Sequence, residues 1–160
     1  MKIGVIIIFR NNESSINVDD LKKQIKSTDA MRFCFVDNNS KDNTVQLLNE
    51  VKEDSEEKIE IVEIKKVVTE PMAKRAGARY LFNNYNLKYT GFINLESLKG
   101  EGASLNAILE HIAQDESFIE EVKTKMDNGN AKQSFFKGIF SIVDSIKEFN
   151  TNYKSLRLSI

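Results

Sequence analysis

The chain has 160 residues, 41% of them hydrophobic and 29% charged, and its formal net charge is −1. This length and balance predict one soluble domain with a sizeable core. So small a net charge argues against a field that draws in nucleic acid or an anionic membrane. The longest apolar run, Ile3–Phe9, is far shorter than the roughly 20 residues that cross a bilayer, and Lys2 alone does not make the charged start of a signal peptide. We therefore expect a cytoplasmic protein with no membrane span.

The first 97 residues alternate strand-like and helix-like segments. Residues 3–9 are almost all apolar and β-branched, which is typical of a strand covered on both faces. Residues 32–36 and 89–94 are also apolar, whereas residues 59–67 alternate apolar and charged side chains and so predict a strand nearer an edge. Apolar stripes between these strands predict helices over residues 18–25, 42–52 and 71–83.

After Gly100 the pattern becomes helical. Apolar stripes predict helices over residues 104–114, 118–126 and 133–149, and Asp127-Asn128-Gly129-Asn130 is a turn signal. The whole pattern predicts an α/β, Rossmann-like fold: a mostly parallel sheet of about four strands in the order 3-2-1-4, with flanking helices and a helical C-terminal portion. We expect residues 1–160 to form a single domain, with an α/β half over 1–97 and the helical portion over 98–160.

Polar residues follow three of the predicted strands at the point where each strand ends. They are Arg10, Asn11 and Glu13 after the first strand, Asp37 and Asn39 after the second, and Asn94 and Glu96 at the end of the fourth. The carboxyl ends of parallel strands meet at one edge of a sheet, where open α/β folds bind ligands. Lys74 and Arg75 add positive charge from an intervening helix. This mixture suits a nucleoside diphosphate, because amides and carboxylates bind a base and ribose while cations neutralise phosphates.

The segment Val36-Asp37-Asn38-Asn39-Ser40-Lys41-Asp42-Asn43-Thr44 carries the most specific signal in the chain. It resembles the motif Val-Asp-Asp-Gly-Ser-x-Asp-x-Thr of the family 2 glycosyltransferases, which have the GT-A fold. Only the second Asp and the Gly of that motif differ, and each is replaced by Asn here.

Three further segments carry the resemblance, which covers about residues 1–110. Asn11-Asn12-Glu13 matches the family's segment after the first strand, although Ile8 and Arg10 replace its proline and tyrosine. Ala73-Lys74-Arg75-Ala76-Gly77 is similar to Ala-Arg-Asn-x-Gly, and Phe92-Ile93-Asn94-Leu95-Glu96 is similar to Phe-Leu-Asp-x-Asp.

The resemblance implies a protein that binds a UDP- or GDP-linked sugar and transfers the sugar to an acceptor with inversion. It places Asp37 against the base and Lys74 against the diphosphate. The other residues that it implies for nucleotide binding are Arg10, Asn11, Glu13, Asn39, Arg75 and Asn94. Asn94 and Glu96 stand where the family keeps acids that bind Mn²⁺ or Mg²⁺, and because Asn94 has no charge we expect that cation to be weakly bound or absent.

Each of these roles has a plainer alternative. Asp37 is also a suitable turn acid, Lys74 and Arg75 are suitable solvated helix charges, and Glu96 is a suitable loop acid without a metal. The family's second half, which is longer, binds the acceptor and supplies a catalytic base, whereas 64 residues follow Glu96 in this sequence and their pattern is helical. The acids available in its place are Asp115, Glu116, Glu120 and Glu121, and their spacing marks none of them as a base.

The alternative function is therefore a catalytically inactive relative that acts as a nucleotide-binding or protein-interaction module, beside a partner transferase or as a homodimer. Phe135, Phe136 and Phe140 would then cover the sheet or form a dimer contact. A third interpretation is an unrelated Rossmann-like domain with a chance match.

Other chemistries find little support in the sequence. Cys34 is the only cysteine and lies in an apolar strand, which predicts a buried, inert thiol, and His111 is the only histidine, which excludes a histidine relay. No Gly-rich phosphate loop follows the first strand. The basic residues are not interleaved with aromatic ones, so we expect no nucleic-acid partner.

Overall fold

The computed structural model describes residues 3–55, 57–87, 89–101, 103–115, 117–118, 120–122, 124 and 139–149. These residues include a sheet in the order β3-β2-β1-β4-β5, in which every neighbouring pair is parallel. The strands are β1 (Ile3–Phe9), β2 (Met31–Asn38), β3 (Ile59–Ile64), β4 (Tyr89–Asn94) and β5 (Ile139–Ser141). The predicted α/β class and the order of the first four strands are confirmed.

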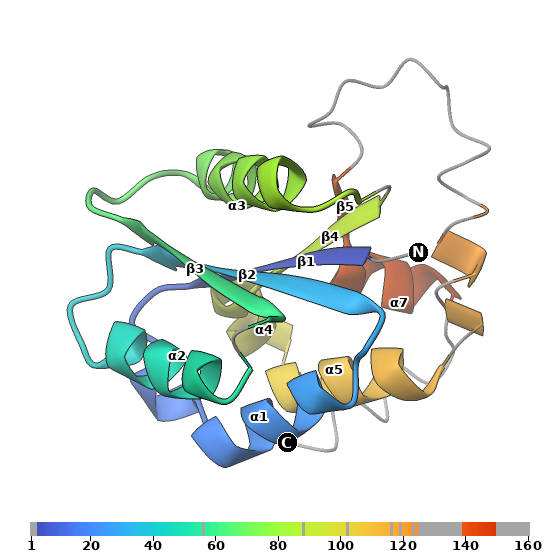
Figure 1. Cartoon of the computed structure of the whole chain (residues 1–160), viewed down its shortest axis with the longest axis horizontal. Coiled ribbons are helices and arrows are strands. Elements are labelled where there is room, and N and C mark those ends of the chain that lie inside the picture. Colours follow the sequence, from blue (N-terminus) through green and yellow to red (C-terminus); the bar gives the residue numbers. More distant parts are fainter. Residues whose placement is uncertain are drawn as a thin grey trace.

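Helices cover both faces of the sheet (Figure 1). Among the described helices, α3 (Glu70–Asn84) is the one that covers the first face, and α1 (Val18–Lys26), α2 (Thr44–Glu53) and α5 (Leu105–Gln114) lie on the other. Two short helices also lie on this second face: α4 (Leu95–Glu101), which directly follows β4, and α7 (Ile142–Phe149), which packs against β4 and β5. A 3-10 turn, η1 (Glu13–Ser15), precedes α1. Helix α4 was not predicted from the sequence.

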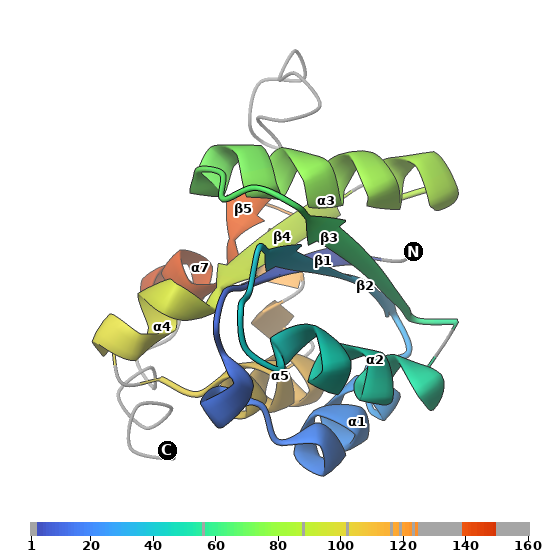
Figure 2. The same cartoon turned by 90° about the vertical axis from the view of Figure 1, so that its left-hand side faces the viewer.

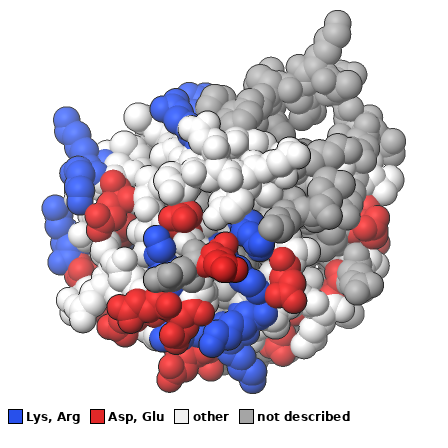
Figure 3. All heavy atoms as spheres, in the orientation of Figure 1, with Lys and Arg blue, Asp and Glu red and all other residues white. Residues whose placement is uncertain are grey.

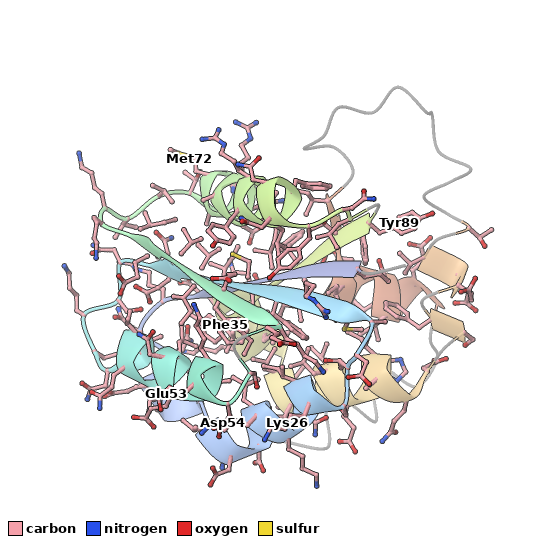
Figure 4. All side chains as sticks on the ribbon, viewed as in Figure 1. Lys26, Phe35, Glu53, Asp54, Met72 and Tyr89 are labelled. Atoms are coloured by element: carbon pink, nitrogen blue, oxygen red, sulfur yellow. The ribbon has the colours of Figure 1, made fainter. Side chains whose placement is uncertain are left out.

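The core is divided by the sheet. All seven residues of β1 are buried, and their side chains alternate between the two faces. Ile6 and Ile8 pack with the α3 side of the core, whereas Ile7 and Phe9 pack with the other side. Phe9 also meets Phe35 of β2 edge to face, with ring centroids 5.3 Å apart, and Figure 4 shows Phe35 between the sheet and α2. Burial of β1 on both faces explains its unbroken apolar sequence.

One buried side chain confirms a prediction made from the sequence, and one glycine explains how α3 packs on the sheet. Cys34 is buried in β2, and burial raises the pKa of its thiol to about 12, so the thiol stays protonated and inert. Gly77 lets α3 approach the sheet closely, because a Cβ there would lie 2.8 Å from Ile6 Cγ2. No helix within the described ranges is long and apolar enough to cross a bilayer.

The predicted helix over residues 133–149 is wrong in part, because Ile139–Ser141 form β5 and only Ile142–Phe149 form a helix. Strand β5 pairs in parallel with β4 and extends the sheet beyond the four predicted strands. A three-residue strand is too short to show alternation, and Ile139 and Phe140 also fit an apolar helical stripe. The predicted turn at residues 127–130, together with Glu116, Phe135 and Phe136, lies outside the described residues.

Smaller differences concern where the elements end. Strand β2 runs through Asp37 and Asn38, two residues beyond the predicted end, and β3 stops at Ile64 instead of continuing to residue 67. In the predicted helix over 118–126, the described residues 118, 120–122 and 124 are helical, and Phe118 and Val122 are buried in the core.

Gly91 decides how closely α7 can pack on β4. A Cβ at this position would lie 2.6 Å from Ile142 Cγ1 and 2.9 Å from the Phe140 ring. We expect Gly91→Ala to lower the free energy of unfolding by about 1–3 kcal/mol, because the new methyl group overpacks this contact. Urea unfolding measures the loss. In an Ile142→Ala background the same change is expected to cost less, and an equal cost in both backgrounds would contradict the packing argument.

Candidate functional site

The candidate site is the edge of the sheet at which the parallel strands end, which we call the carboxyl edge. In Figure 2 this edge faces the viewer. The chain runs from β1 to β2 to β3 on one side and then returns to place β4 on the other side of β1. The direction of winding therefore changes between β1 and β4, and ligands of open α/β sheets bind at such a switch point. The connections after β1 and β2 run side by side at this edge (Figure 2).

These two connections are joined by reciprocal hydrogen bonds. The Asn11 N–H donates to Ser40 Oγ at 2.9 Å, and Asn11 Oδ1 accepts from the Lys41 N–H at 2.8 Å. One turn further on, the Glu13 N–H donates to Asp42 Oδ2 at 3.2 Å, and Glu13 Oε2 accepts from the Asn43 N–H at 2.9 Å. We call the connections 10–15 and 39–43, joined in this way, the loop clasp.

The backbone of the loop clasp is tightly turned. Asn11 and Asn39 adopt left-handed conformations, with φ of 52° and 56°, and Asn is one of the few residues that tolerate this region. Asn12 is fully buried, its N–H donates to Thr44 Oγ1 at 2.8 Å, and its Oδ1 accepts from the Arg10 N–H at 2.6 Å. Asn11 and Glu13 therefore have a structural role in joining the two connections, which was not predicted from the sequence.

Asp37 lies at the base of the clasp and is 3% exposed. Its Oδ1 accepts from Ser40 Oγ at 2.5 Å and its Oδ2 accepts from the Ser40 N–H at 3.1 Å. The carboxylate thus closes its own turn, which is the plainer role that the sequence also allowed. A carboxylate has about four lone-pair positions, so these two bonds do not exhaust its capacity.

A second polar cluster joins α3 to the end of β4. Asn94 Nδ2 donates to Glu70 Oε2 at 2.7 Å, and the Lys74 ammonium lies 4.0 Å from Glu70 Oε1. The same ammonium stands 4.2 Å from the centroid of the Phe92 ring, in cation–π geometry, and its side chain is 23% exposed. Glu70 was not among the residues predicted from the sequence, although its place one turn before Lys74 on the same helix was a usable signal.

The loop clasp with Asp37 and the cluster around Asn94 lie at the same edge of the sheet but on opposite faces. Asn94 pairs with Ile8 of β1, and Asp37 pairs with Phe9. Because side chains of successive strand residues point to opposite faces, Asn94 lies on the α3 side and Asp37 on the other. The two strands that carry these residues flank β1, so they are separated by about 10 Å.

The remaining predicted residues are exposed or half-buried. Arg10 and Glu96 are exposed and Asn39 is half-buried. Glu96 belongs to the first turn of α4, and its N–H donates to Asn94 Oδ1 at 3.1 Å. Arg75 is exposed on α3. The described part of the chain contains no group of three or more His, Cys, Asp or Glu side chains arranged to hold a metal ion.

Two of the acids considered as a catalytic base, Asp115 and Glu120, lie far from this edge. Glu120 lines a cavity with residues 27–31, which precede and begin β2, and therefore lies at the amino edge of the sheet. Asp115 follows α5, whose last turn borders the same cavity, and its Oδ1 accepts from the Phe118 N–H at 3.2 Å. Neither side chain can reach a substrate at the carboxyl edge.

A cavity of about 300 Å³ lies beside the switch point, on the side of the sheet opposite α3. Its walls come from η1, α1, α4 and the start of α5, and include Ser15, Leu21, Leu98, Lys99 and Ser104. No residue of the predicted site lines this cavity.

Comparisons with known proteins add little beyond the fold. No family model matches the sequence, and no curated protein matches it. Solved structures do resemble this fold, at low sequence identity. "Mannosyltransferase PcManGT from Pyrobaculum calidifontis in complex with GDP-Man and Mn2+" is 18% identical with a TM-score of 0.44, over 50% of this chain and 24% of that one.

Two structures of TarS from S. aureus are also similar. The structure described as "S. aureus TarS" is 16% identical with a TM-score of 0.49, over 77% of this chain and 20% of that one. TarS 1-349 in complex with UDP-GlcNAc is 16% identical with a TM-score of 0.48, over 77% and 32%. The chain thus spans 20–32% of the length of these three structures, and likeness at this level carries no functional information.

Asp42 lies in one connection of the loop clasp and accepts hydrogen bonds from the other connection and from the first residue of α2. Partial burial by itself raises its pKa, but hydrogen bonds from the Thr44 hydroxyl, the Thr44 N–H and the Glu13 N–H outweigh burial, so the pKa is lowered. We expect Asp42→Ala to lower the free energy of unfolding at pH 7 by about 1–2 kcal/mol, because these donors lose their acceptor. Urea unfolding at pH 7 and near pH 2 measures the change.

The stabilisation that the Asp42 carboxylate provides is expected to depend on pH in one direction. A carboxylate whose pKa falls on folding stabilises the protein above its unfolded pKa of about 4, and that contribution is lost as the pH falls through the lower folded value. The gap between wild type and Asp42→Ala should therefore shrink near pH 2. Asp42→Asn keeps an oxygen acceptor without the charge and should be less destabilised at pH 7. If wild type and Asp42→Ala differed in free energy of unfolding by the same amount at pH 7 and near pH 2, the charge of Asp42 would contribute nothing to stability.

Proposed function

We propose that this chain is a glycosyltransferase-like protein that binds the nucleoside diphosphate of a UDP- or GDP-linked sugar at the carboxyl edge of its sheet. Transfer of the sugar with inversion is the reaction that the sequence resemblance implies. The observation that carries the proposal is the cluster of Glu70, Lys74 and Asn94 at the end of β4, next to the topological switch point.

The cluster supports phosphate binding because it positions a cation before any ligand arrives. Glu70 and the face of the Phe92 ring hold the Lys74 ammonium beside the strand end. An ordered ammonium forms charge-assisted hydrogen bonds with phosphate oxygens at a lower entropic cost than a free side chain does. In the proposal Lys74 contacts the diphosphate.

The loop clasp supports the proposed base and ribose contacts. Its hydrogen bonds hold Arg10, Asn11 and Asn39 in one arrangement at the end of β1 and β2. Arg10 and Asn39 offer donors and acceptors at the surface, and Asp37 binds the base through the lone pairs that Ser40 leaves. Arg75 is a weaker candidate than the sequence suggested, because it is exposed on the outer side of α3.

A divalent cation would have to arrive with the nucleotide. Asn94 uses its oxygen to accept from the Glu96 N–H, and Glu70 is engaged with Lys74 and Asn94, so the described residues do not form a cage of their own. Mg²⁺ is commonly held by one or two carboxylates together with substrate phosphates. In the proposal Glu96 supplies such a carboxylate and the diphosphate supplies the other oxygens.

A second candidate is a catalytically inactive relative that binds a nucleotide without turnover. It is favoured by the position of Asp115 and Glu120 at the amino edge of the sheet, far from the switch point. The described residues therefore place neither of these acids where it could deprotonate an acceptor. Release of nucleotide from a bound nucleotide sugar separates the two candidates.

Nucleotide binding is tested by calorimetry with UDP and GDP, each with and without Mn²⁺. We expect one of them to bind, and we expect Lys74→Gln to weaken that binding at least about tenfold, the usual consequence of losing a charged hydrogen bond. Lys23→Gln is the matched control, because it removes the same charge from an exposed position on α1. An absence of binding to both nucleotides, or an equal loss in both variants, would contradict the donor-site assignment.

The metal assignment has its own test. Asn94→Asp places a carboxylate against Glu70, whose Oε2 now lies 2.7 Å from Asn94 Nδ2. We expect this variant to be less stable in EDTA by about 1 kcal/mol, or roughly 2–4 °C in its melting temperature, because like charges repel. Mn²⁺ should restore the melting temperature by bridging the two carboxylates, which thermal unfolding measures. No effect of Mn²⁺ on the variant would remove this strand end as a cation site.

A further inference from the structure

Helix α3 carries an exposed basic stripe on the side facing away from the sheet. Residues 73, 77, 78 and 81 are buried against the strands, whereas Met72, Arg75 and Arg79 are exposed. Three and four residues apart, these exposed side chains are neighbours on one face of the helix. Figure 4 shows Met72 on the outer side of α3, away from the sheet.

The connection between β3 and α3 continues this surface. Lys65, Lys66 and Val67 are all exposed there, and the Lys65 side chain is 84% exposed even though it pairs with Glu63 at 3.3 Å. We call residues 65–67 together with Met72, Arg75 and Arg79 the basic face. Figure 3 shows lysine and arginine side chains at the upper left and at the top, over this connection and α3.

The basic face combines exposed apolar side chains with an excess of basic residues. Within the described ranges, Val67 and Met72 are the large apolar side chains that stand exposed, at 46% and 53%. Between residues 65 and 84 the sequence has five basic residues and one acid, Glu70, which is engaged with Lys74 and Asn94. Helices α1 and α2 on the opposite side mix acids with bases, so the basic face is a local asymmetry in a nearly neutral chain.

We propose that the basic face docks this protein onto an anionic membrane surface, with Val67 and Met72 entering the headgroup region and Lys65, Lys66 and Arg79 contacting lipid phosphates. Basic residues near anionic lipids each contribute to binding, and apolar side chains add to it by leaving water. The exposed apolar pair favours a membrane over nucleic acid, because single strands are bound through aromatic stacking and the basic face contains no exposed aromatic residue.

The docking does not depend on the proposed function. The basic face begins directly after β3, at the carboxyl edge, and continues along α3 as far as Arg79, so a docked molecule would hold its candidate site near the membrane surface. Nucleotide binding and membrane binding are separate measurements, and the failure of one leaves the other standing.

Vesicle co-sedimentation tests the proposal with the whole chain. We expect the protein to sediment with vesicles of phosphatidylcholine and phosphatidylserine, to remain in solution with phosphatidylcholine alone, and to dissociate as salt is raised. The double change Lys66→Gln and Arg79→Gln should weaken vesicle affinity about thirtyfold, from roughly 1 kcal/mol for each basic residue. Met72→Ser should weaken it as well without altering the salt dependence.

The control is the double change Lys23→Gln and Lys26→Gln, which removes the same charge from exposed positions on α1. Thermal unfolding shows whether each variant is folded. An absence of sedimentation with anionic vesicles, or an equal loss of binding in the control, would overturn the proposal. Light scattering of the protein alone reveals the competing outcome: self-association that Lys66→Gln and Arg79→Gln abolish, without vesicle binding, would assign the face to a second copy of the chain.

Discussion

Strand β1 can contain no uncompensated polar side chain, because all seven of its residues are buried in the middle of the sheet. After β1, the first polar residue is Arg10, which is exposed where the strand ends at the carboxyl edge. Strands β2 and β4 are aligned with β1 in parallel, so their polar ends emerge at the same edge. The candidate site exists because one strand is buried on both faces and its two neighbours run in the same direction.

The polar groups gathered at this edge are mostly occupied with one another. Asp37 closes its own turn through Ser40, Glu13 accepts from the Asn43 N–H, and Glu70 holds both Lys74 and Asn94. Such mutual bonds make a rigid edge, and a rigid arrangement lowers the entropic cost of binding. They also mean that a ligand must compete with existing partners, Glu70 above all, for Lys74.

The net charge of the chain and the charges on the basic face lead to different expectations about binding to anionic surfaces. A formal charge of −1 indicates no attraction to anionic surfaces for the chain as a whole. A binding surface is smaller than the whole molecule, however. In physiological salt the field of an exposed charge is largely screened beyond about 8 Å. The exposed Lys65, Lys66 and Arg79 therefore act on a nearby partner almost independently of the acids on α2. Only a folded structure shows which charges share a face.

The sequence by itself was enough to predict the α/β class, the parallel order of β3, β2, β1 and β4, and the positions of α1, α2, α3 and α5, because long apolar runs and stripes report burial directly. It also located the polar strand ends. It did not reveal β5, since Ile139–Ser141 becomes a strand only by pairing with β4. Nor did it reveal the partners of Asp37, Glu13 and Lys74, or that Asp37 and Asn94 lie on opposite faces of the sheet. Those features depend on contacts between residues far apart in the chain, and tertiary packing alone determines them.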